Sequence, residues 1–325
     1  MNTIQYFKQF VSTTKKTRKV LKILKDNRFE TDRIRGELLR NVHSIEKGLS
    51  LRNVRNGFGF LKIKEAGEFA NRLLDMKQGV YAEEVRMFIG ALAAYLDYHK
   101  KVNYRDTRLL EVEELFTKLS NRLTSTDNGL PLGGYQQLDV NEHSQEDFEA
   151  FNQLVHSRHS IREFSNEPVP LGKILTAIDL ARYCPNACNR QAFGVHVVCK
   201  DKISVFQNWF DGVGGFADEL DKLLLITAKL SSYRKDEEMQ YIVSASVFAG
   251  YLTLALEVCN IGCCFIQRPV LPSEQWQNIS GQLKISQDEQ IVCALGVGMK
   301  PKTYKVPISH RISLDRVVTI HGTDT

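Results

Sequence analysis

Apolar residues recur at three- and four-residue spacings through the first third of the chain, a pattern typical of amphipathic helices. Within residues 31–48 the apolar positions include Ile34, Leu38, Val42 and Ile45. No stretch here alternates at period two for long, so the first 125 residues are predicted to be all-α. The same spacing predicts further helices at about 4–25, 62–76, 80–102 and 109–123.

The helical pattern stops at Ser125, after which the chain reads STDNGLPLGGYQQLDVNEHS as far as Ser144. Gly, Pro, Asn, Asp and Ser dominate this stretch, a composition typical of a linker between domains. The sequence therefore divides into a helical domain at 1–124, a linker at 125–144 and a second domain at 145–325.

The second domain mixes the helical period with apolar, β-branched runs. These runs predict strands near 195–198, 223–227 and 290–296, and apolar helical segments fall at about 145–156, 170–183 and 237–258. Strands mixed with helices indicate an α+β or an α/β fold.

Composition narrows the class of protein. With 325 residues and 43% hydrophobic residues, the chain can bury a sizeable core, which excludes disorder of the whole chain. The longest uncharged apolar stretch, 241–256, is shorter than the ~20 residues that cross a bilayer. The N-terminus has no apolar core of a secretory signal, so we expect a cytoplasmic protein.

The basic charge is concentrated at one end of the chain. Residues 1–64 hold 16 Lys and Arg against five Asp and Glu, whereas the remainder is acidic. A basic helix at 4–25 could bury Phe7 and Leu21 in an anionic membrane surface, although covering a core or a partner subunit is the commoner role. Aromatic residues are sparse in this stretch, so nucleic acid is not an expected partner.

The seven cysteines all lie between Cys184 and Cys293, mostly in apolar segments. In a cytosolic protein such residues are more often buried than paired in disulfides. The spacings Cys184-x3-Cys188 and Cys259-x3-Cys263 do not fit a zinc site, so no metal is expected.

The first segment that suggests chemistry is Ser157-Arg158-His159-Ser160-Ile161-Arg162-Glu163-Phe164. In an extended loop, Arg158, Ser160 and Arg162 would project to one side. Two guanidinium groups and a hydroxyl are donors suited to a phosphate. The alternative is a solvated loop that follows a helix.

Two further segments are ambiguous when taken alone. The loop from Cys184 to Phe193 carries Asn186, Asn189 and Gln191, whose amides suit the edge of a heteroaromatic ring but could equally satisfy their own turn. Near the C-terminus, Arg311 follows His310 and would ordinarily be a surface charge.

Taken in order and spacing, these segments resemble the nitroreductase family of flavin-dependent oxidoreductases, over about 145–320. The family motif Arg-Arg/His-Ser-x-Arg/Lys-x-Phe is similar to residues 158–164, and its Pro-Ser-x-x-Asn-x-Gln-Pro-Trp loop to residues 185–193. The resemblance continues in a long helix, a small-residue strand at Ile261 to Phe265, and the late Arg311.

The resemblance implies an α+β FMN-binding fold with a mixed or antiparallel central sheet flanked by helices, in a homodimer with the flavin at the interface. Hydride would pass between NADH or NADPH and an organic acceptor through the flavin, without a separate catalytic residue. Arg158, Ser160 and Arg162 would hold FMN, Arg311 its phosphate, and Asn189 and Gln191 the ring edge, with Asn186 supplied by the partner subunit. The full cofactor-binding set is Arg158, His159, Ser160, Arg162, Asn186, Asn189, Gln191, Gln267, Arg268 and Arg311.

The sequence also departs from the family pattern. Ala192 and Phe193 replace Pro-Trp, and residues 266–269 lack the usual glycines, so Gln267 or Arg268 would face the substrate instead. Two alternatives therefore stay open: an oxidase or dehydrogenase that runs in the opposite direction, and a non-catalytic scaffold docked to a membrane or an enzyme. Similar helical extensions precede nitroreductase domains in bacterial polysaccharide gene clusters. We expect a biosynthetic intermediate rather than a nitro compound as the acceptor, because the family name describes an assay more than a role.

Overall fold

The structure is a computed structural model that carries side chains. It describes residues 22–23, 25–76, 79–123, 132–204, 206, 213–237, 239–266 and 273–322, without the side chains of 273–277. The basic helix predicted at 4–25 lies almost wholly outside the described residues, as do Gln267 and Arg268.

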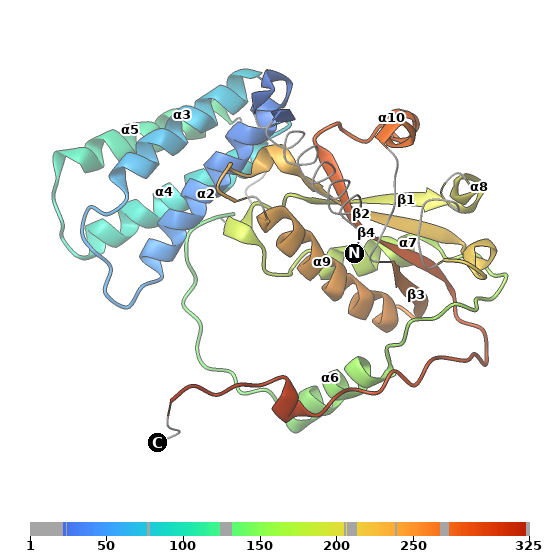
Figure 1. The fold of residues 1–325 in the computed structure, drawn as a ribbon. Coiled ribbons are helices and arrows are strands. Elements are labelled where there is room, and N and C mark those ends of the chain that lie inside the picture. Colours follow the sequence, from blue (N-terminus) through green and yellow to red (C-terminus); the bar gives the residue numbers. More distant parts are fainter. Residues whose placement is uncertain are drawn as a thin grey trace, which may run out of the picture.

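The first part of the chain is helical, as the apolar spacing predicts. A short 3-10 turn, η1 (Asn27–Phe29), leads into four helices: α2 (Glu30–Leu49), α3 (Phe60–Met76), α4 (Ala82–Lys101) and α5 (Thr107–Arg122). Leu38, Leu73, Phe88 and Leu119, one from each helix, are completely buried in a common core. The predicted stripes are therefore the faces on which these helices pack together (Figure 1).

The described residues of the second part form one sheet of four strands: β1 (Phe193–Cys199), β2 (Lys222–Lys229), β3 (Ile261–Ile266) and β4 (Glu289–Met299). The strand order is β1-β2-β4-β3, and each neighbouring pair is antiparallel. This confirms the α+β class and decides between the mixed and the antiparallel sheet in favour of the latter.

Helices and loops cover both faces of the sheet. On one face lie α7 (Leu171–Ala181) and α9 (Gln240–Val258), with Phe248 and Leu252 of α9 buried against the strands. The other face is covered by α8 (Lys200–Ile203), the loop around Phe216, and α10 (Ser273–Gln282). By length and composition alone α9 could cross a membrane, but its buried residues belong to the sheet core.

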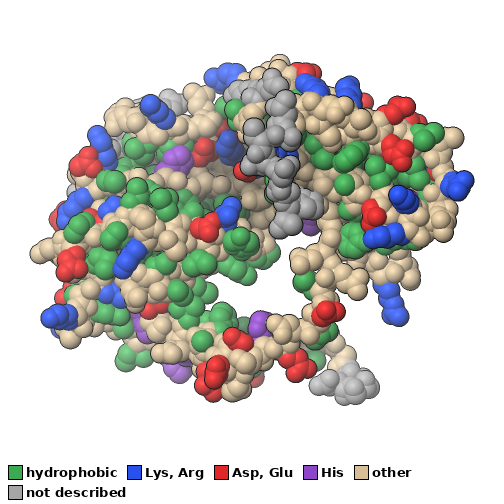
Figure 2. All heavy atoms as spheres, turned by 180° about the vertical axis from the view of Figure 1, so that it is seen from behind, with side chains coloured by type: hydrophobic (Ala, Val, Ile, Leu, Met, Phe, Trp, Pro, Cys, Tyr) green, Lys and Arg blue, Asp and Glu red, His purple; other side chains and the backbone are tan. Residues whose placement is uncertain are grey.

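The helix α6 (Gln145–Ser157) and the C-terminal tail, which contains the 3-10 turn η6 (Leu314–Arg316), lie away from the sheet (Figure 1). A capping box between Ser144 and Asp147 starts α6. None of the side chains of α6 is buried, and Phe148 and Phe151 are 63% and 60% exposed. Figure 2 shows an opening between part of this arm and the body, while α6 also contacts α9. The arm thus presents apolar side chains that a single chain does not cover.

Candidate functional site

The segment that follows α6 is held against the edge strand β3. Ser160 forms an isolated parallel bridge with Cys263, and the Ile161 N–H donates to the Cys263 carbonyl at 2.9 Å. Ile161 and Phe164 are buried beneath the sheet edge. The segment is therefore extended and anchored, and Arg158, Ser160 and Arg162 beside these anchors line a surface pocket.

The pocket has a volume of about 490 Å³ and is formed by segments that lie some 150 residues apart in the sequence. One side comes from the end of α6 and the anchored segment, and the other from the C-terminal tail. Its lining consists of Val155, His156, Arg158, His159, Ser160, Arg162, Pro307, Ile308, Ser309, His310 and Arg311. Five of the sequence-predicted cofactor residues, from the first and third motifs, thus meet in one place.

The pocket is cationic, since its described lining has three arginines and no Asp or Glu. Arg162 makes two contacts in the described part of the chain. Its guanidinium donates to the Ser160 carbonyl at 3.4 Å and lies 5.9 Å from the centre of the Phe216 ring. Arg311 Nη1 donates to the Ser309 carbonyl at 2.5 Å. Backbone oxygens rather than carboxylates hold these two side chains, so their charge is left for an anionic ligand.

Two thiols lie behind the arginines. Burial raises the pKa of Cys263 to about 12 against the opposing charge of Arg158. Burial likewise raises the pKa of Cys264, against the charge of Arg162. Both groups are neutral thiols at physiological pH, and they pack as small apolar residues, as the sequence indicates.

The second predicted segment is a tight loop between α7 and β1 that contains the 3-10 turn η2 (Ala187–Asn189). Its backbone is left-handed at Cys188, Asn189 and Gln191, with φ of 53°, 49° and 49°. Asn186 Oδ1 accepts a hydrogen bond from the Gln191 N–H at 2.9 Å, so this amide serves its own turn. In the described part of the chain, the Asn189 and Gln191 side chains have no hydrogen-bond partner, and Gln191 is exposed.

The structure does not bring this loop into the arginine pocket of the same chain. The loop enters β1, which pairs at its first residue, Phe193, with Ala228, and Ala228 pairs with Gln290 of β4. Ser160 instead pairs with Cys263, which pairs with Val297 of β4. The β4 residues level with the loop and with Ser160 are therefore Gln290 and Val297, which are seven residues apart, about 20 Å along the strand. The loop and Ser160 also lie at opposite edges of the sheet, beside β1 and β3.

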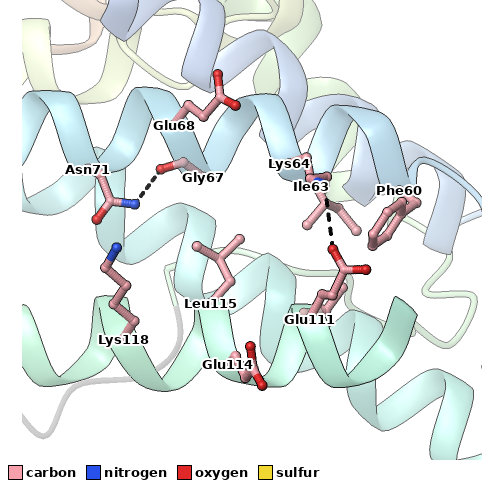
Figure 3. Close-up of a pocket in the computed structure, with 11 residues that line it drawn as sticks. Phe60, Ile63, Lys64, Gly67, Glu68, Asn71, Glu111, Glu114, Leu115 and Lys118 are labelled. Atoms are coloured by element: carbon pink, nitrogen blue, oxygen red, sulfur yellow. Dashed lines mark hydrogen bonds and ion pairs between the residues drawn. The ribbon is translucent and has the colours of Figure 1, made fainter. Parts of the chain in front are cut away.

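The helical domain has a groove of its own, and its chemistry differs. The groove lies between α3 and α5, with a volume of about 330 Å³ (Figure 3). Lys64 and Lys118 alternate there with Glu68, Glu111 and Glu114, and Lys64 pairs with Glu111 at 3.6 Å. Because charges of both signs line it, the groove lacks the single-sign field of the arginine pocket.

The sequence analysis missed part of the pocket. His156 in the last turn of α6 lies two residues before the first motif, so its helical register could have placed it beside Arg158. Pro307 and Ile308 carry no such signal, because only the path of the tail brings them to the pocket. His310, which precedes Arg311 in the tail, also lines it.

Residues 155–229 match the family model described as the nitroreductase family. The chain contains a nitroreductase-family domain. The matched segment includes the anchored arginine segment, the loop at 186–191 and the strands β1 and β2. No curated protein matches the chain.

Solved structures similar to the nitroreductase-family domain cover about half of this chain. A nitroreductase family protein from Streptococcus pneumoniae is 18% identical, with 53% of this chain and 100% of that chain covered and a TM-score of 0.46. An FMN-dependent nitroreductase from Clostridium difficile is 21% identical over 53% of this chain and 99% of its own, with a TM-score of 0.44. A nitroreductase-like protein from Streptococcus mutans is 16% identical over 54% and 100%, with a TM-score of 0.45.

One histidine of the nitroreductase-family domain belongs to a structural network. His196 lies with its Nε2 2.8 Å from Glu289 Oε2, and Thr227 Oγ1 donates to the same oxygen at 2.7 Å. Burial would raise the pKa of Glu289, but these hydrogen bonds outweigh it and hold the pKa below the ordinary 4.5.

The low pKa of Glu289 predicts a pH dependence of stability. A carboxyl group whose pKa falls on folding stabilises the protein above its unfolded pKa, and this contribution is lost as the pH drops through the folded pKa. We therefore expect the free energy of unfolding of Glu289→Gln, measured by urea denaturation, to fall less steeply below about pH 4.5 than that of the wild type. Glu142→Gln, at an exposed carboxylate, is the control. Parallel curves of unfolding free energy against pH for the wild type and both variants would contradict the prediction.

Proposed function

We propose that the protein is an FMN-dependent oxidoreductase that transfers hydride between NADH or NADPH and a small organic acceptor. The observation that carries this proposal is the arginine pocket. Arg158 and Arg162 of the first motif and Arg311 of the tail line one cavity that contains no carboxylate. A phosphate ester is the ligand that best suits a serine hydroxyl and three guanidinium groups without a carboxylate partner among the described residues.

The residues present fit the phosphate end of FMN. In the proposal, Arg158, Arg162 and Arg311 bind the phosphate and ribityl end, while Ser160 donates its hydroxyl and His159 lies at the rim. Bound FMN would supply the hydride chemistry, and the chain's own groups would bind and orient it. Gln267 and Arg268, which lie outside the described residues, remain in the proposed set as groups on the substrate side.

The ring edge requires a second copy of the chain. Asn186, Asn189 and Gln191 lie at the opposite corner of the sheet from the pocket, so one chain does not present both groups to one flavin. We propose a homodimer in which the loop of one protomer completes the pocket of its partner. The exposed apolar residues of α6 and of the tail, including Phe151 and Ile308, support such an intertwined contact.

The location and the pathway are also part of the proposal. All seven cysteines are free thiols, as is usual in the reducing cytoplasm, where we place the protein. We propose a biosynthetic intermediate, for example in bacterial polysaccharide synthesis, as the acceptor. The basic segment at 4–25 is proposed to cover a partner subunit or to touch a membrane surface.

The test is a visible absorption spectrum of the purified protein, repeated after anaerobic addition of NADPH and then of NADH. We expect flavin bands that bleach with one of the two nucleotides. Bands that persist with both would favour the oxidase or dehydrogenase direction, in which the substrate itself reduces the flavin. Absence of flavin after incubation with excess FMN would overturn the proposal and leave the scaffold alternative.

A further inference from the structure

We infer that α2 of the helical domain positions the loop at 186–191, with Arg35 as the positioning residue. The inference rests on the proposed function in one respect, namely that this loop meets the edge of a flavin ring. It assigns to the N-terminal helices a role in the site, although they lie outside the nitroreductase-family domain.

Arg35 connects the two parts of the chain directly. Its Nη1 donates to the carbonyl oxygen of Arg190 at 3.0 Å, and its Nε donates to Glu84 of α4 at 2.6 Å. The side chains of Arg35 and Glu84 are only 17% and 13% exposed. The carbonyl that receives this bond lies between Asn189 and Gln191, so Arg35 fixes the backbone between the two proposed ring-edge residues.

Arg190 anchors the same loop from within. Its side chain is 1% exposed, Nη2 donates to Glu237 at 2.9 Å, and the guanidinium lies 5.3 Å from the centre of the Tyr233 ring. Nε and Nη1 have no hydrogen-bond partner among the residues that the structure describes. Burying a guanidinium with so few partners costs free energy, and we attribute its burial to a role in fixing the loop.

Further contacts hold α2 against residues 229–234, the segment that contains Tyr233. Arg234 donates to both carboxylate oxygens of Glu37, at 2.6 and 2.7 Å, and Lys229 donates to Asp32 at 2.9 Å. Between these contacts, a Cβ on Gly36 would lie 2.6 Å from the Ser232 carbonyl oxygen, so the helix backbone itself touches the segment. The helix is thus a fixed support behind the loop.

The loop conformation explains why such a support is needed. Left-handed backbone at three non-glycine residues within four positions is costly, and it persists only where the surroundings hold it. Within the loop, four amides are hydrogen-bonded: those of Ala187, Asn189, Arg190 and Gln191. Their protection from solvent exchange therefore reports how firmly the loop is held.

The test compares Arg35→Ala with Arg72→Ala in the full-length protein. Arg72 is the matched control, because it makes an ion pair of the same length, 2.6 Å, with Glu30 in the helical domain but is 49% exposed. Two quantities are measured: hydrogen–deuterium exchange of peptides that span 186–192, and the dissociation constant of FMN from flavin fluorescence. Arg35→Lys, which keeps the charge beside Glu84, tests for rescue.

For Arg35→Ala we expect exchange at 186–192 to accelerate about tenfold and FMN binding to weaken by a similar factor, since a hydrogen bond from a charged donor is lost. Arg72→Ala should leave both at wild-type values, and Arg35→Lys should recover part of each. The inference is overturned if exchange in a folded Arg35→Ala protein rises no more at 186–192 than elsewhere. If no variant, including the wild type, binds FMN, the proposed function fails, and the exchange data still decide whether α2 holds the loop.

Discussion

Replacing Arg158 with alanine is expected to weaken FMN binding by a factor on the order of a hundred. The side chain lines the pocket at the end of α6, and the lining holds no carboxylate that could compete for its charge. A hydrogen bond to a charged group contributes roughly 1.5–3 kcal/mol, and about 2.8 kcal/mol corresponds to a hundredfold change in the dissociation constant. The measurement is a titration of flavin-free protein with FMN, followed by the loss of flavin fluorescence.

The control for Arg158→Ala is Arg182→Ala. Arg182 is an exposed arginine just after α7 that pairs with Asp179 at 2.6 Å, so its removal deletes one positive charge from the same domain at a distance from the pocket. Its dissociation constant for FMN should stay within about twofold of the wild type, because a distant exposed charge is screened by salt. An equal loss for both variants would mean that net charge, rather than the pocket, attracts the ligand.

Replacing Phe148 and Phe151 together with aspartate is expected to convert the proposed homodimer into a monomer that no longer retains flavin. Both rings are exposed on α6, an element without any buried side chain. Burying a phenylalanine contributes roughly 1.5–3 kcal/mol, and a symmetric dimer would bury four of these rings, so the expected loss is about 6 kcal/mol or more. Light scattering after gel filtration gives the mass, and the visible spectrum gives the flavin content.

A matched change elsewhere keeps the dimer prediction specific. Leu61→Asp combined with Leu110→Asp removes two exposed apolar side chains, 80% and 59% exposed, from the helical domain. That variant should remain dimeric and should retain its flavin. A wild-type protein that is monomeric at micromolar concentration, yet binds FMN tightly, would refute the intertwined arrangement.

Much of the fold could be predicted because its helices are long and strongly periodic. Helix α2 extends over 30–49 where the spacing of Ile34, Leu38 and Ile45 predicts 31–48. In contrast, α8 and α10 were not predicted. Four residues are too few for a period, and the sequence of α10, SEQWQNISGQ, is mostly polar.

The far end of β4 shows why strand limits are harder to predict. The apolar run predicts a strand that ends at Gly296, but the strand continues to Met299 through Gly298, although glycine ordinarily weakens a strand. A Cβ on Gly298 would lie 2.6 Å from the ring of Phe164, so the glycine makes room for the residue that anchors the arginine segment. The reason for this glycine therefore lies in a residue that is distant in the sequence.

Part of the candidate site could likewise be predicted from the local sequence, and part could not. The alternation of Arg158, Ser160 and Arg162 could be read locally, because an extended chain places every second residue on one side. The arrival of Arg311 depends on the path of the tail. The role of Arg190 was missed altogether, since an arginine in a polar loop is usually exposed, and its burial is set by Tyr233 and Glu237 more than 40 residues away.

The placement of the two halves of the site at opposite corners of the sheet has a genetic consequence. Suppose that one chain is damaged only in its arginine pocket and another only in the loop at 186–191. In a mixed dimer of the two, one site collects both lesions, while the other combines an intact pocket with an intact loop. Two inactive alleles would then complement each other and restore one working site per mixed dimer, whereas two lesions carried on the same chain would show the reverse behaviour beside a wild-type copy, leaving both mixed sites impaired.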